Sequence, residues 1–300
     1  MKQFVLLVLT FVCATACQCQ TYTATIRPNE LIACHDDSVR IDELLVKFAP
    51  DRNLQTGDLV VKIGKQLLGL PYVPHTLENG TDEKLVINLR ELDCTTFDET
   101  CLALAFTLKN GGNSFTDYAF QLQKIRYRNG IRDGYLSRLH YFSDWLYNNQ
   151  EKGMISMVDS SFQTPWQKAI NFMSTHPNSY ELLKENPKLI SQLTEQENEI
   201  SNRKFFFLPK NEIKANEKEL KNGDIVAITT NIAGLDVVHV GFVVWVDGRV
   251  HLLHASSALA KVVISEEPLA DYLAVKKSFT GIMLARPNEH ISSMPASTKK

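Results

Sequence analysis

Apolar residues in the first half of the chain recur at the three- and four-residue spacing of amphipathic helices. This pattern predicts helices over residues 42–48, 59–68, 94–108, 115–126 and 135–148. Glycine and proline interrupt the pattern at 69–74, and a short apolar run at 85–89 has the character of a strand. Two glycines at 111 and 112 end the third helix, because glycine tolerates the left-handed conformation of a helix C-cap.

The last third of the chain changes to strand-like apolar runs, which cover 223–228, 239–246, 250–254, 261–264 and 281–285. Asp247-Gly248 between the second and third runs is a two-residue hairpin signal, and short connections favour an antiparallel meander. Helices followed by an antiparallel sheet of about five strands predict an α+β fold.

A polar segment separates the helices from the sheet. It is rich in Glu, Lys and Asn from Pro165 to about Arg203, and Pro177 and Pro187 interrupt its helical pattern. We interpret its charges as a solvent-exposed face rather than a binding surface. Because the chain shows no internal repeat and no strong linker, we predict one domain with a helical insertion at about 111–205.

The N-terminus has the pattern of a secretory signal. A basic residue and an apolar run at 4–12 precede Ala14 and Ala16, which form a small-residue cleavage site. As a helix this run rises about 14 Å, about half of the hydrocarbon core of a bilayer, so it cannot span. Cleavage after Ala16 would leave Cys17 first, the position lipidated in bacterial lipoproteins, although Ala14 matches a lipobox poorly. We predict a signal peptide over 1–16 and export to the periplasm or cell envelope. Lipidation of Cys17 stays open, and a buried N-terminal strand is the competing interpretation.

Composition and charge exclude several classes of protein. The 300 residues are 44% hydrophobic and 22% charged, which suffices for a core and argues against disorder. The 32 Lys and Arg residues against 34 Asp and Glu give a net charge of −2, so no basic excess exists for binding nucleic acid. No apolar run of about 20 residues follows the N-terminal segment, so no membrane-spanning helix is expected in the mature chain.

Six cysteines are too few for a disulfide scaffold of this length. Cys34, Cys94 and Cys101 lie in the body of the chain. On one helix Cys94 and Cys101 would lie about 10.5 Å apart, beyond the ~7 Å Cα limit for a disulfide. At least one free thiol therefore needs an explanation.

The position of Cys94 in the sequence is typical of a catalytic nucleophile. It starts a predicted helix, where unpaired backbone N–H groups and the positive end of the dipole favour the thiolate and could hold an oxyanion. A thiolate also needs a base, and His239 opens one predicted strand while His254 ends the next. If these strands pair around Asp247-Gly248, the two imidazoles lie at the same sheet edge and one can orient the other.

Each of these residues also has a structural interpretation. A lone helical cysteine is often a small buried hydrophobe, and a histidine beside an apolar strand is often a satisfied structural residue. Zinc binding is a further alternative, but the sequence contains no Cys-x-x-Cys, His-x-x-x-His or His-Glu-x-x-His motif. A Gly-x-Ser-x-Gly elbow and nucleotide-binding loops are absent as well. We predict no metal and no cofactor.

The order of the motifs resembles that of the NlpC-type papain-like cell-wall hydrolases. The resemblance rests on Gly69-Leu70-Pro71-Tyr72, Asp93-Cys94, Gly223-Asp224-Ile225-Val226, His239-Val240-Gly241 and His254-Ala255-Ser256. Within that superfamily the N-acetylmuramoyl-L-alanine amidase-like branch is similar at 89–97, 126–130, 138–145 and 234–241. Together these blocks cover about 59–287. The chain departs from the pattern in the long separation of Cys94 from His239, which the insertion would explain, and in His75, where a small residue is expected.

The resemblance implies a papain-like NlpC-type fold with the nucleophile helix packed on the sheet. It implies a single amidase domain over 59–293, after an N-terminal lead over 17–58. It further implies Cys94 as nucleophile, His239 as base and His254 as the orienting residue.

The same resemblance suggests substrate-binding residues. Tyr72 corresponds to a tyrosine near the oxyanion site, and Asp93 is the candidate for polar contacts with the peptide. Arg138, Tyr141 and Asp144 lie at helical spacing, so one helix face could meet the substrate. An internal salt bridge with packing is the alternative for these three residues.

The implied activity is that of a cysteine amidase. It would hydrolyse the amide between N-acetylmuramic acid, in its 1,6-anhydro form, and L-alanine in muropeptides. Expected partners are muropeptides or peptidoglycan fragments, with no nucleic acid and with a membrane only through a lipid on Cys17. One alternative is an endopeptidase that cuts γ-D-glutamyl–diamino-acid bonds with the same residues. The other is a non-catalytic peptidoglycan-binding lipoprotein, which predicts the loss of Cys94 or His239, and both are present.

Overall fold

The computed structural model describes residues 30–78, 80, 82–184 and 186–289. The predicted signal peptide over 1–16 and Cys17 lie outside these residues. Within them the α-helices are α1 (His35–Phe48), α2 (Thr56–Gln66), α3 (Cys94–Lys109), α4 (Phe115–Arg126), α5 (Phe142–Glu151), α6 (Phe172–Thr175), α7 (Glu181–Lys184), α8 (Pro187–Ser201), α9 (Ile213–Asn216) and α10 (Leu269–Ala274). Short 3-10 turns are η2 (Ala49–Asp51), η3 (Arg128–Gly130), η4 (Tyr135–Ser137), η5 (Ser160–Phe162), η6 (Pro177–Ser179) and η7 (Glu217–Glu219). No helix in the described ranges has the length and apolar character needed to cross a membrane.

The strands form one large antiparallel sheet and one small parallel pair. They are β1 (Leu31–Ile32), β2 (Leu85–Val86), β3 (Ile155–Met157), β4 (Thr164–Trp166), β5 (Phe205–Pro209), β6 (Ile225–Thr230), β7 (Val237–Val246), β8 (Arg249–Ser256), β9 (Lys261–Ile264) and β10 (Phe279–Pro287). The large sheet runs β4-β5-β10-β6-β7-β8-β9, and β3 also pairs with β10, while β1 pairs with β2. The mixed α+β architecture with an antiparallel sheet is confirmed.

The predicted size of the sheet is wrong, because the large sheet has eight strands rather than about five. The extra strands are β3, β4 and β5, which fall inside or directly after the segment predicted as a helical insertion. β3 and β4 have three residues each, too few for a period-2 pattern to become visible in the sequence. They form because β10 and β5 supply the pairing edges.

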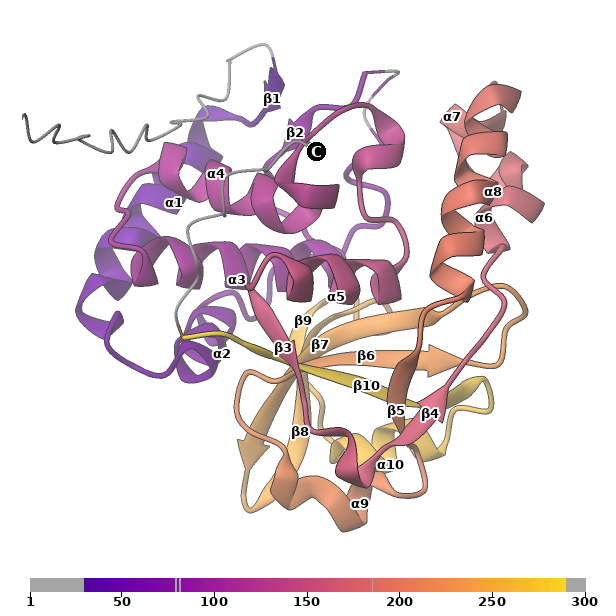
Figure 1. Ribbon diagram of the computed structural model, residues 1–300. Helices are drawn as coiled ribbons and strands as arrows, with labels where there is room; N and C mark the ends of the chain where they lie inside the picture. Colours follow the sequence, from indigo (N-terminus) through magenta and orange to yellow (C-terminus); the bar gives the residue numbers. More distant parts are fainter. Residues whose placement is uncertain (1–29, 79, 81, 185, 290–300) are drawn as a thin grey trace, which may run out of the picture.

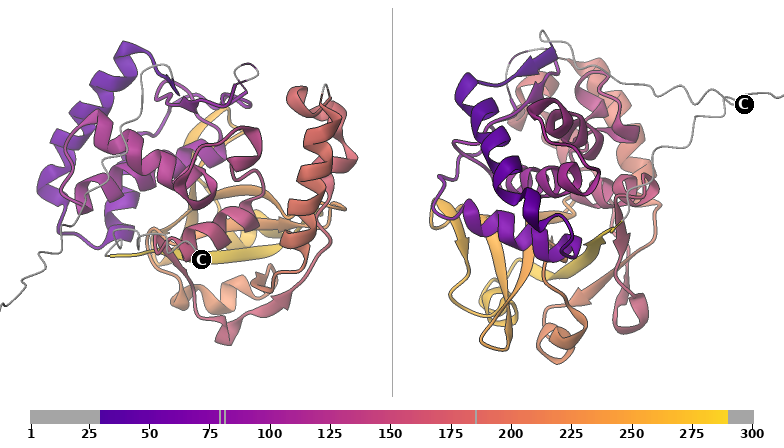
Figure 2. Two further views of the ribbon diagram at one scale, coloured as in Figure 1. Left: turned by 45° about the horizontal axis from the view of Figure 1, so that its top comes forward. Right: turned by 90° about the vertical axis from the view of Figure 1, so that its left-hand side faces the viewer.

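Helices cover both faces of the sheet (Figure 1). The helices α1–α5 lie over one face and bury the largest core, to which α3 contributes Phe97, Cys101 and Phe106. The helices α9 and α10 lie against the other face over a second core. The helices α6–α8 stand at one side as an arm with its own small core, as the left view in Figure 2 also shows. Residues of α1 belong to the largest core, so this core begins upstream of position 59.

The helix α3 is central to this arrangement and begins at Cys94, as the sequence predicts. Asp93 is its N-cap, and its carboxylate accepts the N–H of Thr96 at 2.7 Å. Most of the helix is buried on all sides, so its apolar residues do not form a single stripe. The helix contacts α1, α2 and α4 on its helical side and β7 and β8 on its sheet side.

The predicted helix over 135–148 is only partly correct. Arg138 has an extended backbone and forms an isolated bridge with Tyr127, and α5 begins at Phe142. The bridge to Tyr127 ties residue 138 to the end of α4, so the backbone there cannot be helical. Arg138, Tyr141 and Asp144 therefore do not share one helix face, and that expectation is wrong.

The hairpin that connects β7 and β8 turns at Asp247-Gly248, as predicted. Both residues have positive φ, 48° and 78°, as a two-residue type I′ turn requires. The turn fixes the register in which Phe242 opposes Leu253. This register brings the start of β7 next to the end of β8, and it thereby sets the positions of His239 and His254.

Candidate active site

Cys94 is the first residue of α3 and is half-buried. Its thiol lies against β7, where the backbone N–H of Val240 hydrogen-bonds to the sulfur. Burial, followed by the charge of Asp93, raises the pKa of the thiol to about 12, although the bond from Val240 acts in the opposite direction. Burial therefore opposes the thiolate that the helix N-terminus is expected to favour in the resting protein. Because burial disfavours the charged thiolate, the thiol needs a base to lose its proton.

The structure brings His239 and His254 together. Nε2 of His239 lies 2.6 Å from Nδ1 of His254, and the rings meet edge to face at 87°. The prediction that the two imidazoles meet at one sheet edge is confirmed. Both are buried, with 8% and 1% of their surface exposed. Burial lowers the pKa of His239 to about 4, and burial followed by the charge of His239 lowers that of His254 to about 3. We call His239 and His254 the imidazole pair.

Two tyrosines flank this group. Tyr72 is half-buried, and burial, followed by the charges of Cys94 and Asp93, raises its pKa to about 12, so its hydroxyl keeps its proton. Tyr272 on α10 lies edge-on to His254, with ring centroids 5.7 Å apart, and burial, followed by the charge of Cys94, raises its pKa. Sequence reasoning identified Tyr72 but missed Tyr272, which no motif marks in the sequence.

Asp93, predicted to contact the peptide, is engaged locally. Its carboxylate accepts both the N–H and the hydroxyl of Thr96, at 2.7 and 2.9 Å. One turn further on, Asp98 is fully buried, and neither of its oxygens has a hydrogen-bond partner within the described residues. Burial, followed by the charge of Glu99, raises the pKa of Asp98 well above its usual range, so the site on α3 favours the neutral form of this carboxyl.

The segment that leads into β7 is held by residues of the insertion. Lys168 donates to three carbonyl groups at 2.5–2.7 Å, those of Thr230, Ile232 and Leu235. The buried carboxylate of Asp236 accepts the N–H of Ser143 at the start of α5 at 2.7 Å. Gly234 has a φ of 75°, and a Cβ there would lie 2.3 Å from the side chain of Asn171, so only glycine fits. These contacts fix the backbone at residues 230–236, up to three residues before His239. Sequence reasoning missed Lys168.

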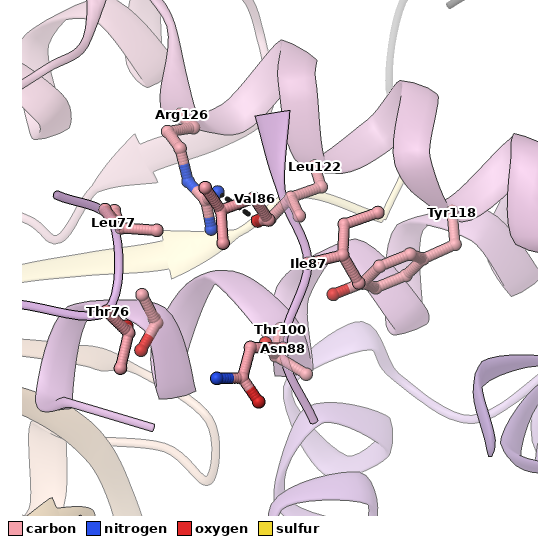
Figure 3. A pocket seen from close by; sticks show the side chains of 10 residues that line it. Thr76, Leu77, Val86, Ile87, Asn88, Thr100, Tyr118, Leu122 and Arg126 are labelled. Carbon is pink, nitrogen blue, oxygen red and sulfur yellow. Dashed lines mark hydrogen bonds between the residues drawn. The ribbon is translucent and has the colours of Figure 1, made fainter. Parts of the chain in front are cut away.

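A buried ion pair holds the other side of α3. Arg126 on α4 donates through Nε to Glu99 at 2.7 Å. Its Nη1 donates to the carbonyl of Val86 at 2.6 Å (Figure 3). The guanidinium borders a cavity of about 10 Å³, which is room for about one water molecule. It thereby joins α3, α4 and the segment that leads to Cys94.

The three other predicted substrate-binding residues lie in the insertion with their polar atoms engaged. Arg138 pairs with Glu78 at 2.8 Å and with Glu83 at 3.4 Å. The hydroxyl of Tyr141 donates to Glu197 at 2.6 Å and accepts the N–H of Met173. Asp144 accepts from Asn148 and pairs with two arginines, Arg128 and Arg203. We call Arg138, Tyr141, Asp144 and these partners the insertion cluster. The contacts within the cluster match the alternative interpretation, in which these residues form internal salt bridges and pack against one another. Substrate contact by Arg138, Tyr141 and Asp144 stays a prediction.

Within the residues that the structure describes, no group of three or more His, Cys, Asp or Glu side chains is placed to hold a metal ion. Cys34, Cys94 and Cys101 are all unpaired thiols. The reactive groups gathered at this sheet edge are thus one thiol and two neutral imidazoles.

Known proteins resemble this chain over most of its length. The N-acetylmuramoyl-L-alanine amidase-like (AmiA-like) family matches residues 62–282. This chain belongs to that family. No curated protein matches the sequence. An N-acetylmuramoyl-L-alanine amidase from Bacteroides uniformis is 40% identical, with a TM-score of 0.75 over 78% of this chain and 99% of the other.

Other solved structures share the fold. A Bacteroides fragilis protein, assigned provisionally as a xylanase, is 41% identical, with a TM-score of 0.71 over 74% of this chain and 98% of the other. A Legionella pneumophila protein is 21% identical, with a TM-score of 0.64 over 84% of this chain and 94% of the other, and this likeness concerns the fold alone. Membership in the amidase-like family implies a hydrolase that acts on peptidoglycan-derived substrates.

Proposed function

We propose that this protein is a cysteine amidase of the NlpC-type papain-like class. It hydrolyses the amide between N-acetylmuramic acid and L-alanine in muropeptides. The observation that carries the proposal is the 2.6 Å contact between Nε2 of His239 and Nδ1 of His254. The thiol of Cys94 accepts a hydrogen bond from the backbone N–H of Val240, which directly follows His239 in β7. This is the arrangement of nucleophile, base and orienting group that covalent acyl transfer needs.

The contact with His254 determines which role each of the two ring nitrogens of His239 can have. Nε2 is occupied by His254, so Nδ1 is the nitrogen that can take the thiol proton. For Nδ1 to act as a base, Nε2 must carry the hydrogen and donate it to Nδ1 of His254. His254 then carries its own hydrogen on Nε2. In this role His254 holds the tautomer and the orientation of His239, and it does not touch the substrate.

The reaction follows in two stages. Sγ of Cys94 attacks the lactyl carbonyl carbon while its proton moves to Nδ1 of His239. The C–N bond then breaks, the amine takes this proton, and a peptide that begins with L-alanine leaves. Water next attacks the thioester, gives a proton to His239 and releases the muramic acid carboxyl group, and the thiol is restored. Tyr72 and the uncapped N–H groups at the start of α3 are the donors for the oxyanion.

The site chemistry favours amide over glycoside hydrolysis. Glycosidases use two carboxyl groups on opposite sides of the scissile bond. Here the carboxylate of Asp93 caps α3, and Asp98 is fully buried. A thiol and an imidazole pair suit acyl transfer instead, so we assign the amidase function and not the xylanase function given to one relative.

We further propose a small 1,6-anhydro muropeptide as the substrate. The insertion arm α6–α8 stands beside the helical layer, and Ile170 pairs with Gly234 in the loop that leads to His239 (Figure 1). An arm joined to the catalytic strand in this way would obstruct a long glycan chain. We also propose an exported protein, as the pattern at 1–16 predicts. The mass of the native N-terminus distinguishes plain cleavage from lipidation of Cys17.

The test is digestion of defined soluble anhydro muropeptides and of intact sacculi, with the fragments identified by mass. We expect free peptides that begin with L-alanine from the soluble substrate and little release from sacculi. Equal release from sacculi would contradict the small substrate. Products that keep muramic acid on L-alanine and are cut after D-glutamate would instead identify an endopeptidase.

A further inference from the structure

A groove of about 330 Å³ opens next to the segment that carries Tyr72. Its walls come from residues 32–34, from residues 73–76 and from the segment 86–91, which leads from β2 into α3. The groove holds few charged side chains, and Arg90 provides its cation.

An isolated backbone bridge between Tyr72 and Leu92 joins two segments that line the groove, and this bridge lies two residues before Cys94 in the sequence. The N–H of Val73 donates to the carbonyl of Leu92 at 3.1 Å, and the N–H of Leu92 donates to the carbonyl of Pro71 at 3.0 Å. The residue between 71 and 73 is Tyr72, whose pKa is raised by burial and then by the charge of Cys94. Arg90 precedes Cys94 by four positions, so their Cα atoms are at most about 14 Å apart.

Asp37 holds the side chain of Arg90 in place, but the end of the guanidinium remains accessible to a ligand. Its Nε donates to Oδ1 of Asp37 at 3.4 Å, and 57% of its side chain is exposed. The carboxylate of Asp37 is fully buried and also accepts the N–H groups of Leu89 and Cys34 and the thiol of Cys34. Within the described residues neither terminal nitrogen of Arg90 donates to a protein group. The fork of the guanidinium is thus free to bind a planar anion.

We infer that this groove is the subsite for the peptide stem of the substrate, and that Arg90 binds the α-carboxylate of its second residue, D-glutamate. The inference rests on the proposed function. D-Glutamate continues the stem through its γ-carboxyl, so its α-carboxylate is free. An extended peptide advances about 3.3–3.6 Å per residue, so this group lies about 7–10 Å from the scissile bond. A side chain rooted four residues before Cys94 can reach that position.

The groove also holds an opposing charge. Glu91 accepts from Nδ2 of Asn88 at 3.3 Å, so its carboxylate is directed along the same wall. With one positive and one negative side chain, the groove is suited to a stem that carries both charges, not to free anions. Selectivity for the α-carboxylate therefore depends on the fixed position of Arg90 rather than on a positive field.

The test uses two anhydro muropeptides with the same tripeptide stem, which differ only in carrying D-glutamate or D-isoglutamine. For the wild-type enzyme we expect kcat/KM to be about tenfold higher on the carboxylate form, a modest effect because Arg90 is exposed to solvent. In Arg90→Gln this preference should fall to about one, mainly through KM, since the contact is the same in ground and transition states. Arg52→Gln, at another exposed arginine, should keep the preference.

Two results would overturn the inference. One is a wild-type enzyme that cleaves both forms equally or prefers the amide. The other is an Arg90→Gln enzyme that is slower on both forms but keeps its preference, which would show that Arg90 acts only by supporting Asp37 and the backbone of Leu89. Failure of the proposed function looks different, because neither form would then yield free peptide. In that case the Kd of each muropeptide for the Cys94→Ala protein tests the subsite directly, and equal values overturn it.

Discussion

The imidazole pair and the insertion cluster are both buried groups of polar side chains, but they differ in what their atoms have left to bind. In the insertion cluster Asp144 forms ion pairs with two arginines and accepts a hydrogen bond from Asn148. The hydroxyl of Tyr141 donates one hydrogen bond and accepts another. In the imidazole pair only the facing nitrogens of His239 and His254 meet, and no hydrogen bond within the described residues occupies the other nitrogen of His239. Ion pairs and hydrogen bonds among its own members make the insertion cluster structural, whereas an imidazole nitrogen that is not used in a hydrogen bond leaves the imidazole pair able to act as a base.

The two regions also differ in charge. The insertion cluster is ionic, with carboxylates and guanidinium groups that hold one another in place. Burial keeps the imidazole pair neutral, because the pKa values of both histidines lie well below 6.5. Mutations should therefore affect catalysis in one region and stability in the other.

The largest expected effect is that of Cys94→Ala, which should lower kcat by at least about 10⁴-fold, because the thioester can no longer form. The matched control is Cys101→Ala, seven residues along the same helix, with a buried thiol that the mechanism does not use. Both variants should fold, since alanine suits a helix. Peptide release from an anhydro muropeptide measures both. Turnover by a clean Cys94→Ala preparation would contradict the thiol mechanism.

His239→Ala should cost nearly as much as Cys94→Ala, because nucleophile and base act as a unit. His254→Ala should cost less, about 10²-fold, because His254 only orients the base. His251→Ala is the control on the same strand, since Nδ1 of His251 bonds to the carbonyl of Ser265 away from the pair. The rate at which Cys94 is alkylated at neutral pH gives a second measurement. An equal rate with and without His239 would show that the pairing of thiol and base is wrong.

In the insertion cluster, Asp144→Asn should lower the free energy of unfolding by about 3 kcal/mol, because two arginines lose their buried partner. We expect KM and kcat of the folded protein to stay within about twofold of the wild type, because distant sites with no shared partners act independently. Chemical denaturation and steady-state kinetics give the two values. A raised KM with unchanged stability would instead support the substrate-binding prediction for Asp144.

The pH dependence should follow the imidazole pair. Because burial lowers the pKa of His239 to about 4, the base stays neutral and competent well below pH 6.5. The value of kcat/KM should fall only as pH drops through about 4, by about tenfold per pH unit. Circular dichroism at each pH separates this loss from unfolding. An acid limb near 6.5 would show that His239 is not buried as described, or that it is not the base.

The features that the sequence predicted correctly depend on local signals. The capping residue Asp93 marks the start of α3, and Asp247-Gly248 sets the hairpin register that brings His239 to His254. What it missed depends on contacts between distant segments. Lys168 anchors the loop before β7 from about 60 positions away, and Tyr272 reaches the site from α10. The high pKa of Cys94 was missed for the same reason, because burial is a property of the packed protein.

The most direct test of the central claim is a mass measurement of the enzyme during turnover. The protein is mixed with a soluble anhydro muropeptide, quenched in acid within one turnover and digested, and the adduct is located by mass spectrometry. We predict a peptide containing Cys94 that carries the anhydro-muramoyl group, with free L-alanyl peptide released in equal amount. An adduct on another residue, or free peptide with no covalent intermediate on Cys94 under any quench, would contradict the account.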